Sequence, residues 1–238
     1  MTPLAVRSPK GGECGVDVKL LDLILPVRCV VCGAGGEQLC AACRERLPRL
    51  RPPWCHRCGA PTAWPVARCR ECSGRRVAFA SARAAVAYDD GVRKLVRAWK
   101  ERGLRTLAAT AADEVALALS PPEGAAAIAF VPPDRARSLE RGHHPAERLA
   151  RELGGRWALP VQPLLARTKP APRQRGLALA ERRRNVAGAF TPAGDSPTRV
   201  VLVDDVYTSG STANAAASAL RRGGARRVDV VTFARVVR

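Results

Sequence analysis

The chain has 238 residues, of which 47% are apolar, and this is enough for one substantial core and excludes a fully disordered protein. The longest apolar stretch near its start, LLDLILPV, is interrupted by Asp22 and falls short of the roughly eighteen residues that a membrane-spanning helix needs, so we expect neither a span nor a signal peptide. Forty Lys and Arg against 21 Asp and Glu give a formal charge of +19, which favours polyanionic partners such as nucleic acid, nucleotide phosphates or anionic lipid.

The positive charge has two explanations. Of the 40 basic residues, 35 are Arg and five are Lys, a bias that a GC-rich genome produces without any functional demand. The distribution of the charge is more informative, because residues 166–190 carry seven basic residues and one acidic residue. We expect this segment to meet an anion.

In chain order, three regions follow from the composition. Residues 1–18 lack apolar periodicity and are predicted to be a disordered tail, and residues 19–76 form a cysteine-rich module that apolar burial alone cannot stabilise. From 77 to 238, apolar runs alternate with helical patterns, which predicts an α/β domain with a mostly parallel sheet flanked by helices. Strands are expected at 78–87, 125–131, 159–165, 199–204 and 227–236, and helices at 91–101, 104–119, 143–153 and 212–222.

Eight of the nine cysteines form four CxxC pairs, and the ninth, Cys14, lies in the predicted tail. A CxxC pair places two thiolates on one tight turn, and two pairs complete a tetrahedral zinc site. We therefore predict two structural zinc ions in a zinc-ribbon-like module, held by Cys29, Cys32, Cys40, Cys43, Cys55, Cys58, Cys69 and Cys72.

The pairing order and the role of the zinc stay open at this point. We favour sequential pairing, while an interleaved arrangement, first pair with third and second with fourth, is the alternative. Four disulfides are less favoured, since no secretory segment precedes the cysteines. A thioredoxin-like redox role is less favoured because it needs one CxxC pair and four are present, and iron–sulfur ligation is a minor alternative. The zinc either only folds the module or also presents it to nucleic acid. We expect Gly33 and Gly59 to form the turn after a pair, and His56 to be exposed rather than a ligand.

Residues 200–213, VVLVDDVYTSGSTA, combine a β-branched run, two carboxylates, a small polar loop and a helix start. A parallel strand would deliver Asp204 and Asp205 to the carboxyl edge of the sheet, where open α/β folds bind ligands. The loop would then offer backbone N–H groups and hydroxyls to an anion, from Thr208, Ser209, Gly210, Ser211 and Thr212. The Gly-Lys-Ser/Thr ending of a Walker A loop is absent, which excludes that class of nucleotide site. The pattern indicates a sugar phosphate, and the alternative is a capped strand–turn–helix connection without a ligand.

VVLVDDVYTSGST resembles the phosphoribosyl-pyrophosphate signature of type I phosphoribosyltransferases. From about residue 19 to 236 the chain resembles the ComF family, bacterial proteins associated with DNA uptake in natural transformation, in which a zinc module precedes a phosphoribosyltransferase domain. Further matches are VPPDRARSLERG at 131–142, the segment 167–190, and the single residues Tyr88, Lys100, Arg167, Gln174, Leu177, Arg184, Asn185 and Phe190. One departure is His143-His144-Pro145, where the family usually has Phe-Asn-Gln.

The resemblance implies that Asp204 and Asp205 hold the ribose hydroxyls, directly or through Mg²⁺, and that residues 208–212 bind the 5-phosphate. It also implies a pyrophosphate loop from Pro132 to Arg137 and a flap at 167–188 that closes over the leaving pyrophosphate. Arg137, Arg167 and Arg184 would then contact substrate, although 167–188 also fits a basic linker or solvated helix face.

The implied function is that of a cytoplasmic phosphoribosyltransferase with an unknown acceptor, linked to nucleoside metabolism and DNA uptake. The alternative is a protein without turnover that retains phosphoribosyl pyrophosphate or a nucleotide as a signal. Its zinc module and Arg-rich flap would bind single-stranded DNA, with DNA-uptake proteins as partners.

Overall fold

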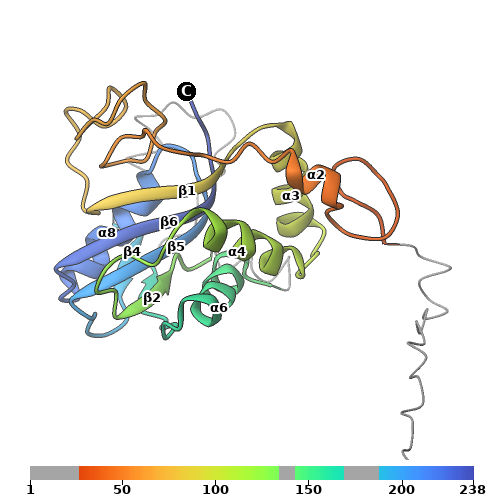
Figure 1. Cartoon of the computed structure of the whole chain (residues 1–238). Coiled ribbons are helices and arrows are strands. Elements are labelled where there is room, and N and C mark those ends of the chain that lie inside the picture. Colours follow the sequence, from red (N-terminus) through yellow and green to blue (C-terminus); the bar gives the residue numbers. More distant parts are fainter. Residues whose placement is uncertain (1–26, 134–142, 169–187) are drawn as a thin grey trace, which may run out of the picture.

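The computed structural model describes residues 27–133, 143–168 and 188–238 (Figure 1). Four strands form a sheet in the order β1-β6-β5-β2, and every neighbouring pair in it is parallel. The central pair, β5 and β6, spans nine residues in each strand and is buried along most of its length, because helices cover both faces. The strands are β1 (Ser81–Ala87), β2 (Ala127–Phe130), β5 (Arg199–Tyr207) and β6 (Arg227–Arg235).

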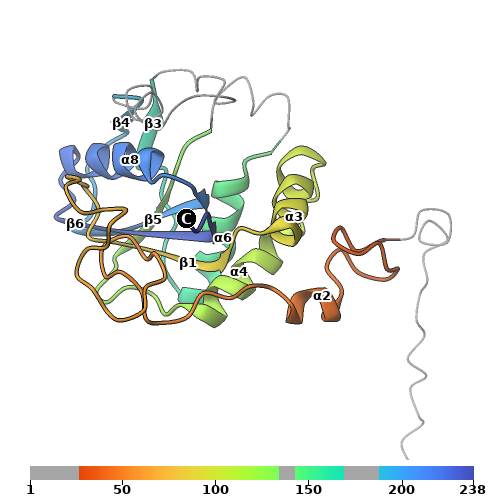
Figure 2. The same cartoon turned by 90° about the horizontal axis from the view of Figure 1, so that it is seen from above.

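Helices lie on both faces of this sheet (Figure 2). On one face, α3 (Asp90–Glu101), α4 (Leu107–Ala118) and α6 (Pro145–Trp157) share an apolar cluster with alternate residues of β5 and β6. On the other face, α8 (Ser211–Arg222) packs on the intervening residues of the same strands. The predicted fold class, a parallel α/β sheet flanked by helices, is confirmed.

One predicted strand, 159–165, is wrong over most of its length. Only Val161 bridges Ile128 of β2, because Pro160 and Pro163 remove two N–H donors from this stretch. The chain forms instead a short antiparallel pair beside α8, made of β3 (Leu165–Arg167) and β4 (Phe190–Pro192).

The cysteine-rich segment does not fold as one separate body. Residues 29–47, which include α2 (Ala41–Glu45), pack on the face of α3 and α4, and we call this part the first ribbon. Residues 54–76, the second ribbon, lie apart from the first, near β1, β6 and α8 (Figure 1). Between the two ribbons the chain follows the free edge of β1, where Leu50 N–H donates to Ala85 O and Ala87 N–H donates to Pro48 O, each at 2.8 Å. This covers an edge that would otherwise be open to another strand.

A buried carboxylate fastens the first ribbon to α4. The side chain of Glu114 is 1% exposed and accepts hydrogen bonds from Arg44 Nε at 2.7 Å and Arg49 Nε at 2.9 Å. Two guanidinium groups therefore compensate one buried charge, and both come from the cysteine-rich segment. In the described ranges, no helix is both long and apolar enough to cross a membrane.

Candidate functional site

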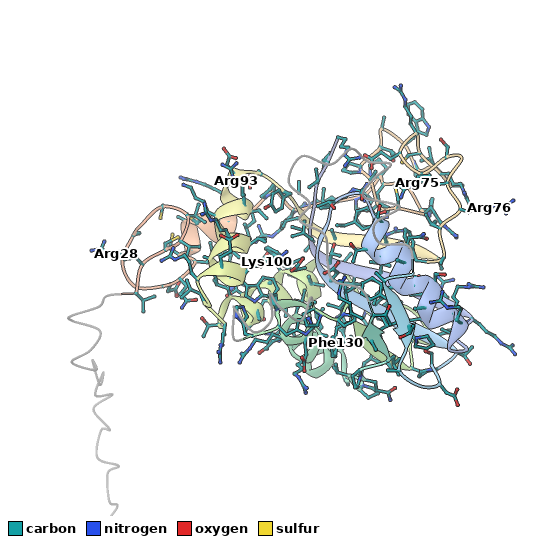
Figure 3. The ribbon with its side chains drawn as sticks, turned by 180° about the vertical axis from the view of Figure 1, so that it is seen from behind. Arg28, Arg75, Arg76, Arg93, Lys100 and Phe130 are labelled. Carbon is teal, nitrogen blue, oxygen red and sulfur yellow. The ribbon has the colours of Figure 1, made fainter. Side chains whose placement is uncertain are left out.

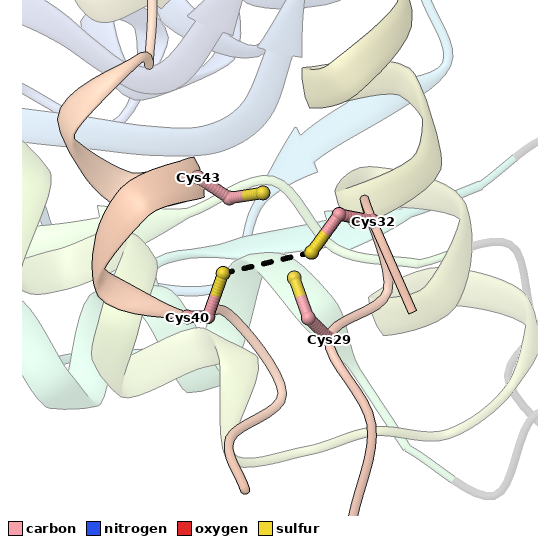
Figure 4. A group of neighbouring side chains, drawn as sticks. All are labelled: Cys29, Cys32, Cys40 and Cys43. Carbon is pink, nitrogen blue, oxygen red and sulfur yellow. Dashed lines mark hydrogen bonds between the residues drawn. The ribbon is translucent and has the colours of Figure 1, made fainter. Parts of the chain in front are cut away.

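The first group of cysteines combines a turn and a helix start. Cys29 and Cys32 come from the turn that Gly33 ends with a φ of +81°, while Cys40 precedes α2 and Cys43 lies in it (Figure 4). All four sulfur atoms lie within 4.8 Å of one another, and the Sγ atoms of Cys32 and Cys40 are 3.6 Å apart.

The second group repeats this arrangement in the second ribbon. The Sγ atoms of Cys55 and Cys72 are 3.5 Å apart, as are those of Cys58 and Cys69. The turn after Cys58 requires glycine, because Gly59 has a φ of +72° and a Cβ there would overlap the backbone oxygen of Ala82. The knuckle of this ribbon is therefore pressed against β1.

Both groups fit zinc. Tetrahedral ligation with zinc–sulfur bonds of about 2.3 Å requires sulfur atoms about 3.8 Å apart, close to the separations found, whereas a disulfide needs about 2.05 Å. Zinc binds thiolates, and in each group one cysteine has a lowered pKa that favours its thiolate form. Burial alone would raise the pKa of Cys55, yet hydrogen bonds from backbone groups of Cys58 and Cys69 lower it to about 7. Cys29 has its pKa lowered to about 6, because backbone hydrogen bonds from Cys32 and Cys40 outweigh burial. Zinc would close both sites and stabilise the ribbons around them.

The acidic pair lies near the carboxyl end of β5. Burial, and then the charge of Asp205, raise the pKa of Asp204 to about 7. The Asp205 carboxylate forms an ion pair with Lys100 of α3 at 2.7 Å, and Asp204 Oδ1 accepts the Asp205 N–H at 2.9 Å. Near neutral pH Asp204 is therefore only partly ionised, and a bound cation would favour its ionised form.

The polar loop lies directly beside the pair. Gly210 precedes α8 with a φ of +73°, and a Cβ at this position would overlap the Tyr207 hydroxyl, so only glycine fits. The first-turn N–H groups of α8 have no acceptor within the helix, and those after Ser211, whose N–H donates to Ser209 Oγ at 3.4 Å, are available to an anion. The space between Asp204, Thr208 and Gly210 measures about 20 Å³, which is room for one water or ion.

Two other predicted segments reach this edge of the sheet. Arg167 Nε donates to Pro132 O at 3.2 Å, and the guanidinium lies 4.5 Å from the Phe190 ring centroid. Its positive charge also acts on Asp204 and lowers the pKa of that carboxyl. The structure therefore places the start of the predicted pyrophosphate loop and the start of the predicted flap close to the acidic pair. Arg137, Arg184 and most of both segments lie outside the described residues.

The second ribbon also contacts the polar loop, which the sequence did not predict. Arg235 is 1% exposed, donates to Cys58 O at 2.6 Å and forms an ion pair with Glu71 at 2.6 Å. Its guanidinium lies 4.7 Å from the Tyr207 ring centroid, and Arg75 donates to Ser209 O at 3.0 Å. The conformation of the loop thus depends on residues of the second ribbon.

A double zinc ribbon domain matches residues 20–73 of the chain. Over 227 residues the chain is 29% identical to Competence protein F of Haemophilus influenzae, an alignment that covers 87% of this chain and 96% of that protein. The chain is therefore similar to Competence protein F over most of its length.

Two solved structures also resemble this chain, each with a TM-score of 0.34. One is a protein of Thermus thermophilus, at 21% identity over 54% of this chain and 83% of that one. The other is orotate phosphoribosyltransferase from Aeropyrum pernix, at 22% identity over 63% of this chain and 67% of that one. A TM-score this low supports no argument about function.

The two predicted groups of zinc ligands are confirmed. All eight predicted ligands occur in two groups, and the pairing is sequential rather than interleaved. His56 is exposed and belongs to neither group. Cys14 lies outside the described residues.

Proposed function

We propose that the chain is a ComF-type protein that binds phosphoribosyl pyrophosphate with Mg²⁺ at the carboxyl end of β5. One observation carries the proposal: the strand places Asp204 and Asp205 directly before a polar loop and the N-terminus of α8. Carboxylates can hold ribose hydroxyls or Mg²⁺, and a helix N-terminus can hold a phosphate, so one short segment offers both contacts.

The proposed roles follow from charge. Asp204 and Asp205 hold the ribose hydroxyls, directly or through Mg²⁺, while residues 208–212 bind the 5-phosphate. Arg167 faces the charge that develops when pyrophosphate leaves the anomeric carbon. Arg137, Arg184 and the flap at 167–188 keep the roles that the family resemblance implies. Because the enclosed space beside Asp204 is only about 20 Å³, it accommodates an ion or water, and the sugar phosphate would lie over its opening.

We infer that the reaction is phosphoribosyl transfer in the cytoplasm to an acceptor that the sequence does not specify. The similarity to Competence protein F supports a role in DNA uptake. A second candidate is a protein without turnover that senses a nucleotide and binds single-stranded DNA. One observation favours it: Trp64 in the second ribbon is 68% exposed and could stack on a base.

Ligand-induced thermal shifts, together with pyrophosphate release, test these candidates. Phosphoribosyl pyrophosphate with Mg²⁺ should raise the melting temperature of the wild type and of Asp195→Asn, an exposed matched control, but hardly that of Asp205→Asn. Equal shifts in all three proteins would rule out the site. Pyrophosphate release with one of a panel of bases would establish transfer, whereas a shift without release would favour the sensing candidate.

A further inference from the structure

A pocket of about 450 Å³ lies between the last turn of the second ribbon and the outer face of α8. Figure 3 shows Arg75 and Arg76, which belong to the second ribbon. The volume lies in the range of small-ligand sites. The pocket is lined by Gly74, Arg75, Arg76, Gly188, Ser211, Asn214, Ala215, Ser218 and Arg222.

The α8 residues of the pocket form one stripe along the helix. They follow helical spacing from Ser211 to Arg222, a length of about 16 Å at 1.5 Å per residue. The alanines on the opposite face of α8 pack on the sheet, so this stripe, which is polar except for Ala215, faces away from the sheet. It begins beside the polar loop, since Ser211 Oγ lies 2.9 Å from Ser209 Oγ.

The pocket holds positive charge that no carboxylate among the described residues neutralises. None of its lining residues is acidic, and Arg75, Arg76 and Arg222 have no ion pair with any residue in the described part of the chain. By contrast, Arg156 on α6 pairs with both Asp113 and Glu152. Three guanidinium groups at one concave surface attract an anion.

Two of these guanidinium groups are held in place by neutral acceptors. Arg75 donates to Ser209 O at 3.0 Å, and Arg222 donates to Phe190 O at 2.9 Å and to Ser218 Oγ at 3.2 Å. Asn214 Oδ1 accepts from Ala78 N–H at 2.7 Å, which leaves the amide NH₂ as a further donor. The pocket therefore presents fixed donors and unneutralised charge, which suits a phosphate group.

We propose that this pocket binds a phosphate group of a ligand, separately from the polar loop before α8. The ligand is either a small free phosphate compound or the phosphodiester backbone of single-stranded nucleic acid. The inference stands whether or not the acidic pair binds phosphoribosyl pyrophosphate, because the three arginines and Asn214 that carry it lie outside that site, and only Ser211 belongs to both.

Calorimetry on the zinc-loaded full chain, without divalent cations in the buffer, tests the proposal. Inorganic pyrophosphate and a short oligothymidylate are the two probes. The test variant is Arg76→Gln/Arg222→Gln, and the matched control is Arg221→Gln/Arg226→Gln, which removes the same charge from neighbouring exposed positions outside the pocket. Arg76→Gln alone guards against misfolding, because Arg76 contacts no hydrogen-bond or ion-pair partner among the described residues.

The pocket variant should bind at least one probe about tenfold more weakly, with the control near wild type. A loss with pyrophosphate identifies a small phosphate as the ligand, and a loss confined to oligothymidylate identifies a phosphodiester backbone. Unchanged binding of both probes, or an equal loss in the control, would overturn the proposal.

Discussion

The pKa of Asp204 leads to a test of the acidic pair in the absence of ligand. In the unfolded chain this carboxyl titrates near 3.8, and in the folded chain burial beside Asp205 raises its pKa to about 7. Between these values the folded state binds more protons than the unfolded state, so the stability contributed by this group is lost as pH rises toward 7. Asn at position 204 keeps the shape and carries no charge, so the variant escapes this loss.

The magnitude follows from the shift. At about 1.36 kcal/mol per pKa unit, a rise from 3.8 to about 7 corresponds to at most about 4 kcal/mol. About 2 kcal/mol of this falls between roughly pH 5.5 and 7, a range in which the zinc sites can stay loaded. Relative to wild type, Asp204→Asn should therefore gain about 2 kcal/mol of stability across that range and change little above it.

Urea unfolding of zinc-loaded wild type and Asp204→Asn across that pH range is the assay. Asp195→Asn is the control, because this exposed carboxylate should show no such pH-dependent difference. A constant difference between Asp204→Asn and wild type at all pH values would refute the shifted pKa. A linked expectation is that Mg²⁺ affinity of the wild type rises as pH increases through about 7, since the cation requires ionised Asp204.

Three further predictions concern the supports of the site. Glu114→Gln should lower the free energy of unfolding, measured by chemical unfolding, by about 3 kcal/mol, because two guanidinium groups lose their buried partner. The control Glu101→Gln, at an exposed ion pair, should cost less than about 0.5 kcal/mol. Gly210→Ala should lower the free energy of unfolding by about 1 to 3 kcal/mol and weaken the binding of phosphoribosyl pyrophosphate. Gly103→Ala has a similar φ but open space around it, so it should change only the stability. Equal ligand affinity of the two variants would contradict the loop assignment. Elemental analysis should find two zinc ions per chain, and bound iron would contradict the zinc assignment. Cys58→Ala should speed amide hydrogen exchange at residues 209–211, whereas Cys32→Ala should not. Equal exchange rates in the two variants would contradict the link between the second ribbon and the polar loop.

The local parts of the structure could be predicted from the sequence. The CxxC spacing predicted the eight zinc ligands and favoured their sequential pairing, because each group then closes within a short loop. The run before Asp204 and the small residues after it predicted a strand, a loop and a helix, since each signal lies within a few residues. The division at residues 18 and 76 stays a prediction, and the tail and most of the flap lie outside the described residues.

The long-range contacts could not be predicted. Arg235 and Glu71 are 164 residues apart in the sequence, and nothing in either neighbourhood indicates the other. The same holds for Glu114 and Arg44, which are 70 residues apart. The sequence did not show that the first ribbon packs on α3 and α4 while the second lies near β1, β6 and α8, because such contacts join distant segments.

Calorimetric titration of phosphoribosyl pyrophosphate into the zinc-loaded chain tests the central claim most directly. With Mg²⁺ present we expect one ligand to bind per chain, and Asp205→Asn should weaken it tenfold or more, which corresponds to the loss of a charged hydrogen bond worth about 1.5 to 3 kcal/mol. Absence of binding, or equal affinity of wild type and Asp205→Asn, would contradict the claim.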